Sequence, residues 1–142
     1  MMHLFLDTNI VIDFLTDRKP FSHHAARLFD YSDKGRVKLY LTAVSYNNTY
    51  YILRKLSSHK EAIKTMKALE GLTETLDTTA SSVKSALQAD FRDFEDAIQY
   101  FAAKESGVMN GIVTRNTADF KRSTLPIWTP EQAVNLVEHS EF

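Results

Sequence analysis

The sequence contains no cysteine and only four glycines and three prolines among its 142 residues. The lack of cysteine excludes a disulfide framework, a thiolate metal site and a cysteine nucleophile, and it fits a reducing compartment. So few glycines and prolines predict that most of the chain is regular structure. No apolar run approaches the ~20 residues of a membrane-spanning helix, and the first residues lack the features of a secretory signal. We therefore expect a soluble, cytoplasmic protein with no membrane partner.

Apolar residues make up 44% of the chain, and the formal net charge is only −1. This composition excludes disordered and low-complexity proteins, and the length suits one core, so we expect a single domain over residues 1–142. The small net charge hides an asymmetry, because residues 1–71 carry +4 and residues 72–142 carry −5. Two ordinary solvated surfaces would explain this. So would a basic surface beside an acidic pocket, which would suit a metal-dependent enzyme acting on a polyanion.

Short apolar segments alternate with segments of helical periodicity along the whole chain. Strands are expected over residues 3–6, 37–41, 72–76, 111–114 and 126–128. Helices are expected to begin near residues 10 and 22, after Thr42 and Ser58, at Thr79, near residue 91 or 92, and after Thr129. Gly71 is expected to end the fourth of these helices. The alternation predicts an α/β fold with a parallel β-sheet flanked by helices on both faces.

Polar side chains follow three of the expected strands. Asp7, Thr8 and Asn9 follow the first strand, Thr42 follows the second, and Arg115, Asn116 and Asp119 follow the fourth. Ligands of such sheets bind at the carboxyl ends of the strands, so these residues are candidates for a common site. For Asp7, a metal ligand and a helix N-cap are both compatible with the sequence.

A second group of acidic residues lies at the start of the sixth expected helix. It comprises Asp90, Asp93, Glu95 and Asp96. Asp93 and Asp96 are neighbours on a helix because they are three residues apart. A solvated first turn, stabilised by the helix dipole, would explain them. A hard divalent cation would explain them as well, since it would relieve the repulsion between close carboxylates.

Several other kinds of chemistry are disfavoured. The five histidines show no spacing typical of metal ligands, and the chain has no G-x-S-x-G, P-loop or G-x-G-x-x-G motif. A phosphotransferase of the haloacid dehalogenase type also begins with an aspartate after its first strand. That chemistry needs a second aspartate two residues later, where this chain has Asn9.

Four segments together resemble the motifs of PIN-domain nucleases. Residues 6–10 (LDTNI) resemble the opening motif of that family, and residues 96–100 (DAIQY) resemble its third acidic motif. Residues 113–120 (VTRNTADF) are similar to its fourth motif, and the segment 126–130 with the helix after it fits as well. The resemblance covers nearly the whole chain, in the right order and spacing. Many PIN domains are the toxin ribonucleases of VapBC-type toxin–antitoxin pairs.

The resemblance implies a carboxylate cluster that holds one or two Mg²⁺ or Mn²⁺ ions and hydrolyses RNA phosphodiester bonds with metal-activated water. It implies that Asp7 and Asp96 are direct metal ligands. Asp93 and Asp119 are then further acids that line the site, directly or through water. The resemblance therefore implies an endoribonuclease that acts as the toxin of a toxin–antitoxin pair.

The sequence departs from the family pattern at two acidic positions, where Asn48 and Asn116 stand. An asparagine keeps an oxygen ligand but loses the charge, so these two residues would be neutral ligands or would orient water. Two lost charges should weaken divalent metal binding, for which Asp93, Glu95 or Asp119 would compensate if the site binds metal. Two outcomes stay open: an active ribonuclease with a rearranged site, or a nucleic-acid- or partner-binding module with little catalysis.

The remaining expectations concern substrate and partners. Thr8, Asn9, Thr114 and Arg115 would contact the substrate at the site. Further candidates for phosphate contacts are Arg18, Lys19, Arg54 and Lys55, although each alone is more typical of an ordinary solvated side chain. The partners would be RNA, an antitoxin protein and a second copy of the chain. Tyr50, Tyr51 and Tyr100 could serve such protein contacts, or could belong to the core.

Overall fold

The sheet is the centre of the molecule. The computed structural model describes residues 1–140, in which five strands form one parallel sheet of order β3-β2-β1-β4-β5. The strands are β1 (Met2–Leu6), β2 (Val37–Thr42), β3 (Glu74–Leu76), β4 (Gly111–Val113) and β5 (Ile127–Trp128). The first strand of the chain therefore lies in the middle, between β2 and β4.

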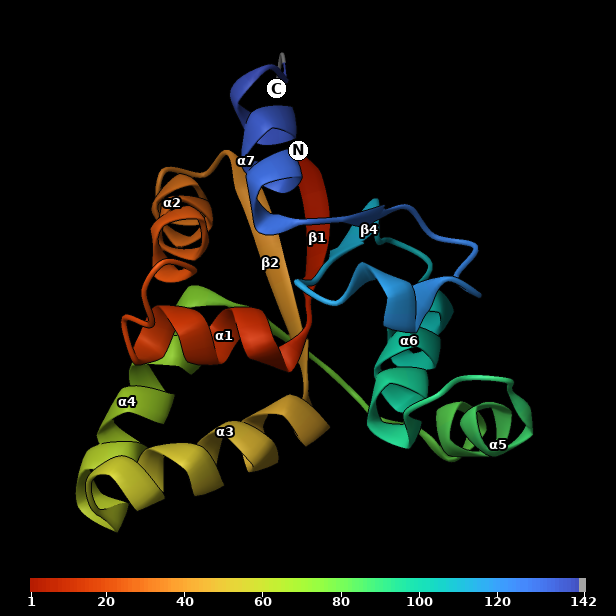
Figure 1. Cartoon of the computed structure of the whole chain (residues 1–142), viewed down its shortest axis with the longest axis horizontal. Helices are drawn as coiled ribbons and strands as arrows, with labels where there is room; N and C mark the ends of the chain where they lie inside the picture. The colour runs from red at the N-terminus through yellow and green to blue at the C-terminus, as the bar shows by residue number, and fades with distance from the viewer. Residues whose placement is uncertain (141–142) are drawn as a thin grey trace.

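Seven α-helices and one 3₁₀ helix surround the sheet within the described residues (Figure 1). They are α1 (Thr8–Leu15), α2 (Ser22–Asp33), α3 (Ala43–Leu56), α4 (His59–Leu72), α5 (Ala80–Gln88), α6 (Phe94–Ser106), η1 (Thr117–Phe120) and α7 (Pro130–Glu138). Within residues 1–140, no helix is both long and apolar enough to cross a lipid bilayer.

Both faces of the sheet are covered, because successive strand residues point to opposite sides. On one face, strand residues such as Leu4, Leu6 and Leu39 pack against the apolar sides of α1, α2, α4 and α7. On the other face, Phe5, Tyr40 and Ile112 pack against residues of α6 and η1, including Tyr100, Ala103 and Phe120. The predicted α/β architecture with helices on both faces is confirmed.

Polar caps begin most of the helices where the sequence predicts them. The side chains of Thr42, Ser58 and Thr79 each accept a hydrogen bond from the backbone N–H three residues later, and Thr129 does the same. Several boundaries differ from the prediction by one to three residues, and β3, for example, begins at Glu74 rather than at residue 72. Gly71 does not end α4, which continues to Leu72, and α6 begins at Phe94 because Asp93 caps it.

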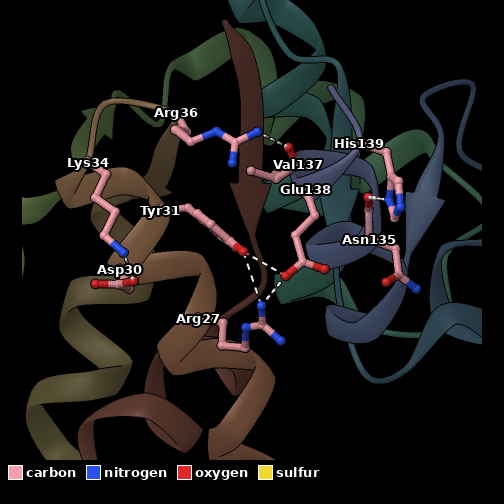
Figure 2. A network of polar contacts seen from close by, with 9 residues as sticks. All are labelled: Arg27, Asp30, Tyr31, Lys34, Arg36, Asn135, Val137, Glu138 and His139. Atoms are coloured by element: carbon pink, nitrogen blue, oxygen red, sulfur yellow. Dashed lines mark hydrogen bonds and ion pairs between the residues drawn. The ribbon is translucent and has the colours of Figure 1, made fainter. Parts of the chain in front are cut away.

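Charged side chains join α7 to α2 (Figure 2). Glu138 accepts hydrogen bonds from Arg27 and from the Tyr31 hydroxyl, the latter at 2.6 Å. Arg36 donates to the backbone carbonyl of Val137 at 2.8 Å. These contacts hold the last helix against the early part of the chain and complete one face of the core.

Gly111 lies directly beneath the indole ring of Trp128. A Cβ atom at residue 111 would be 2.2 Å from Trp128 Cζ3, which is far inside contact distance. Gly111→Ala is therefore expected to lower the free energy of unfolding by about 1–3 kcal/mol, measured by urea denaturation.

Gly71→Ala provides the matched control for this substitution. A Cβ at Gly71, inside α4, would have no atom within 4 Å. The alanine should leave stability unchanged or raise it by about 0.5–1 kcal/mol, since alanine favours a helix. Equal effects of the two substitutions would contradict the proposed role of Gly111.

Candidate active site

Asp7 and Thr114 meet at the carboxyl ends of two adjacent strands, β1 and β4. The Thr114 hydroxyl donates to Asp7 Oδ2 at 2.7 Å, and the Asp7 backbone N–H donates to the Val113 carbonyl at 3.0 Å. Both side chains are buried. Asp7 occupies the N-cap position of α1, yet its carboxylate makes no capping hydrogen bond. The carboxylate is therefore not used as a helix cap, which was the alternative explanation for it.

A second carboxylate is held between α3 and α6. Asn48, in the second turn of α3, donates through Nδ2 to Glu95 Oε1, and Gln99 Nε2 donates to Glu95 Oε2 at 3.3 Å. The Gln99 side chain is fully buried. The same side chain acts to lower the pKa of Asp7. The amide of Gln99 thus contacts Glu95 and influences the carboxylate that follows β1.

The acidic groups raise one another's pKa values. Burial is the largest cause of the raised pKa of Asp96, about 7, and Asp7 and Asp93 add the next largest contributions. Burial also raises the pKa of Glu95, again with Asp7 and Asp93 adding to it. The pKa of Asp7 is raised by burial in spite of its hydrogen bond from Thr114. Asp7 and Asp96 therefore lie on the same side of the molecule and share a strongly negative environment.

The other predicted site residues lie around these carboxylates. The side chain of Asp93 caps α6 by accepting from the Asp96 N–H at 3.0 Å. Asp119 lies in η1 and contributes to the raised pKa of Asp7 and of Asp96. The backbone N–H of Asn116 donates to the Thr114 hydroxyl at 3.0 Å, while the Asn116 side chain is exposed. The 3₁₀ helix after β4 thus borders the same cluster.

The start of α1 is tied to α3. Thr8 Oγ1 donates to Ser45 Oγ at 3.0 Å, and both residues are buried. Asn9 Oδ1 is also buried, and among the described residues it has no hydrogen-bond partner. Figure 1 shows α1 and α3 beginning at the same end of β1 and β2. This end of the sheet is where the sequence placed the site.

The comparison with known families identifies the fold. A family model described as a PIN domain matches residues 3–118, which is most of the chain. The chain belongs to the PIN-domain family. The recognition made from the four sequence motifs is thereby confirmed.

The relatives of this PIN domain include toxins of toxin–antitoxin pairs. Ribonuclease VapC1 of Aquifex aeolicus is 22% identical over 134 residues, which cover 91% of each chain. DNA-bound VapBC from Salmonella typhimurium gives a TM-score of 0.69 at 18% identity, covering 92% of this chain and 99% of that one. Mycobacterium tuberculosis VapC20, a Sarcin–Ricin loop cleaving toxin, gives 0.62 at 16% identity, with 77% and 86% covered.

Arg115 of the PIN domain is engaged by a buried carboxylate of α1. Its Nε donates to Asp13 Oδ2 at 2.6 Å and its Nη2 to Asp13 Oδ1 at 3.3 Å. Asp13 is 1% exposed. The guanidinium also lies 4.1 Å from the centre of the Phe21 ring. These contacts give Arg115 a structural role, and its contact with substrate stays a prediction.

The other predicted contact residues differ in exposure. Arg18, Lys19, Arg54 and Lys55 are exposed, as phosphate contacts would need to be. Among the aromatics, Tyr51 is 56% exposed and Tyr50 is half-buried, but Tyr100 is 2% exposed and belongs to the core. Tyr51 therefore stays available for a partner, while Tyr100 does not.

The donor set of the site fits a hard divalent cation. Carboxylate and amide oxygens surround it, and within residues 1–140 no lysine, arginine or histidine forms an ion pair with Asp7, Glu95 or Asp96. No three acidic or histidine side chains in that range form a ready-made ligand set. Mg²⁺ keeps several waters and needs only one or two direct carboxylates, so the arrangement is compatible with it.

Two features of the site were not predicted from the sequence. The hydrogen bond from Gln99 to Glu95 had only a weak signal, because the two residues are four positions apart on a helix. The Asp13–Arg115 pair also had a signal: an aspartate inside the apolar run of α1 needs a buried partner.

The raised pKa of Asp96 predicts a pH-dependent stability of the metal-free protein. This carboxyl has a pKa of about 7 when folded and 3.8 ordinarily, so the unfolded chain releases its proton first as pH rises. Its contribution therefore lowers stability between about pH 4 and pH 7. Asp96→Asn should be about 1–2 kcal/mol more stable than wild type at pH 8, after allowance for solvent screening, and equal to it at pH 4.

Urea denaturation in EDTA at both pH values would measure this difference. Asp33→Asn, which alters an exposed carboxylate of α2, is the control. An Asp96→Asn variant that gains no stability at pH 8 would show that the surroundings do not destabilise the ionised Asp96 carboxylate.

Proposed function

We propose that this PIN domain is a Mg²⁺- or Mn²⁺-dependent endoribonuclease. The observation that carries the proposal is the pairing of two acids that have raised pKa values. The Asp7 carboxylate is buried, and the pKa of Asp96 is raised to about 7 by burial and by neighbouring acids, Asp7 among them. Maintaining several carboxylates together without a basic partner is costly. A divalent cation would offset that cost, and the RNA phosphate would then approach a positive centre.

Asp7 and Asp96 would hold the ion directly, and Asp93 and Asp119 would line the site. When bound, the ion would acidify a water and stabilise negative charge on the phosphate. Thr114 holds Asp7 in place through its 2.7 Å hydrogen bond. Thr8, Asn9, Thr114 and Arg115 are proposed to position the substrate, with Asn116 orienting water from the exposed rim. Asn48 donates its amide to Glu95, which favours a positioning role over a ligand role.

The cellular role proposed is that of the toxin in a toxin–antitoxin pair. Aquifex aeolicus VapC1 is a ribonuclease, and the Salmonella typhimurium structure is of a VapBC complex. We propose by analogy that this chain acts in the cytoplasm as a single domain, forms a homodimer, and binds an antitoxin protein. The exposed apolar side chains of α3, Tyr51, Ile52 and Leu56, are candidates for these protein contacts.

The test is an RNA cleavage assay with and without metal. The purified chain is incubated with labelled hairpin and single-stranded RNAs in Mn²⁺ or Mg²⁺, in EDTA, and after the metal is added back. Cleavage with metal, none in EDTA, and recovery on re-addition are expected. Cleavage that continues in EDTA would contradict the metal-dependent mechanism, and none under any condition would contradict the nuclease proposal.

A binding module with little catalysis is the second candidate. The neutral Asn48 and Asn116 favour it, because each replaces an acid of the family pattern. Calorimetry with Mn²⁺ separates the two. The nuclease should bind Mn²⁺ below millimolar concentrations, whereas no heat of binding at millimolar Mn²⁺ would favour the binding module.

A further inference from the structure

Position 48 of α3 lacks a charge but faces an acid from another helix. Asn48 stands at the second acidic position of the motif pattern, and its side chain is half-buried. Its amide donates to Glu95 Oε1, across 47 residues of sequence. Glu95 lies in the first turn of α6, one residue before Asp96. The carboxylate missing from α3 is thus present at the same place, carried by α6.

The contacts of Glu95 fix its orientation and leave it able to bind a cation. Each of its two oxygens accepts one amide hydrogen bond, one from Asn48 and one from Gln99. A carboxylate has about four lone-pair sites, so each oxygen keeps one free. Two amide donors also suit an anion, whereas an acid at position 48 would repel Glu95. The asparagine therefore complements Glu95 and need not be a loss of function.

The buried side chain of Gln99 provides an independent observation at the same cluster. Its side chain is fully buried and contacts Glu95, and its Oε1 has no hydrogen-bond partner among residues 1–140. A buried amide oxygen without a partner is rare and carries the cost of its lost hydration. A cation with its bound water beside Glu95 and Asp7 would satisfy this oxygen.

We propose that Glu95 supplies the third negative charge of the divalent cation site and binds the cation through its bound water, with Asn48 and Gln99 as the positioning residues that orient it. The proposal rests on the metal-dependent function above and deepens it. The carboxylate of Glu95 on α6 would then replace the negative charge that Asn48 of α3 lacks. The fold tolerates this replacement because α3 and α6 are already in contact through these side chains.

The test removes the carboxylate at position 95, places one at position 48 instead, and measures metal binding. Mn²⁺ affinity is determined by calorimetry for wild type, Glu95→Gln, and the double variant Asn48→Glu/Glu95→Gln. Glu95→Gln should weaken Mn²⁺ binding by roughly 10–100-fold, and the double variant should recover most of it. Glu70→Gln removes an exposed acid of α4 and should bind as wild type does. RNA cleavage should follow the same order.

The outcomes separate this inference from the proposed function. If wild type binds Mn²⁺ and Glu95→Gln binds it within twofold as tightly, the role of Glu95 is overturned and the proposed function stands. A double variant can fold normally, with the circular dichroism and melting temperature of wild type, and still fail to recover Mn²⁺ affinity. That result would overturn the explanation that Glu95 replaces the charge missing at position 48. If wild type binds no Mn²⁺, both proposals fail together.

Discussion

Asp7→Asn is expected to reduce RNA cleavage about 100-fold or more at saturating Mn²⁺. The substitution removes one charge from the metal-binding group, and a loss of about 3 kcal/mol of transition-state stabilisation corresponds to that factor. Asparagine keeps an oxygen that can accept the 2.7 Å hydrogen bond from Thr114. The geometry at the end of β1 should therefore survive, and the loss would be chemical.

The stability of the Asp7→Asn protein provides the control within the same variant. Burial raises the pKa of Asp7, so its ionised form is unfavourable in the metal-free fold at neutral pH. The variant should melt at the same temperature as wild type or higher in EDTA, and Mn²⁺ should no longer raise its melting temperature. Asp33→Asn, on the surface of α2, should behave as wild type in both assays. Full cleavage activity in Asp7→Asn would remove Asp7 from the mechanism.

Arg115→Ala is expected to lower the free energy of unfolding by about 3–5 kcal/mol. The substitution leaves the Asp13 carboxylate, which is 1% exposed, without the guanidinium that donates to both of its oxygens. A buried charge that loses its partner lowers the free energy of unfolding by about 3–5 kcal/mol. The loss of an exposed ion pair lowers it by less than about 1 kcal/mol. Chemical denaturation at pH 7 would measure it.

Arg122→Ala is the matched control for the Arg115→Ala substitution. Arg122 pairs with Asp90 at 3.1 Å, and both side chains are largely exposed. A large loss for Arg115→Ala beside a small loss for Arg122→Ala would show that Arg115 stabilises the fold. A double variant, Asp13→Asn/Arg115→Ala, should recover part of the stability. If Arg115→Ala is as stable as Arg122→Ala, the guanidinium is free for the predicted substrate contact.

The fold followed from local signals in the sequence. Threonine or serine caps, with helical apolar periodicity after them, place most helix starts correctly, as at Thr42 and Thr129. The errors at the end of α4 and at the start of α6 have physical reasons. Gly71 lies in an open helical turn where glycine carries no special backbone requirement, and Asp93 takes the cap position that ends the loop before α6.

The site was predictable only in part. The carboxyl ends of parallel strands meet at one edge, so Asp7 and Thr114 could be placed together from topology alone. The contacts of Glu95 with Asn48 and of Arg115 with Asp13 depend on side-chain directions across 47 and 102 residues of sequence. Periodicity within one element carries no information about such pairs.

The central place of β1 has a consequence for synthesis on the ribosome. β1 leaves the ribosome before the other strands of the sheet, yet one of its two neighbours is β4, and the hydroxyl that donates to Asp7 is that of Thr114, 107 residues later. A nascent chain cut short before that point has an open sheet edge and an unsupported aspartate. A polypeptide that ends before Thr114 would therefore lack the group that positions Asp7, and we expect it to be inactive in the proposed hydrolysis.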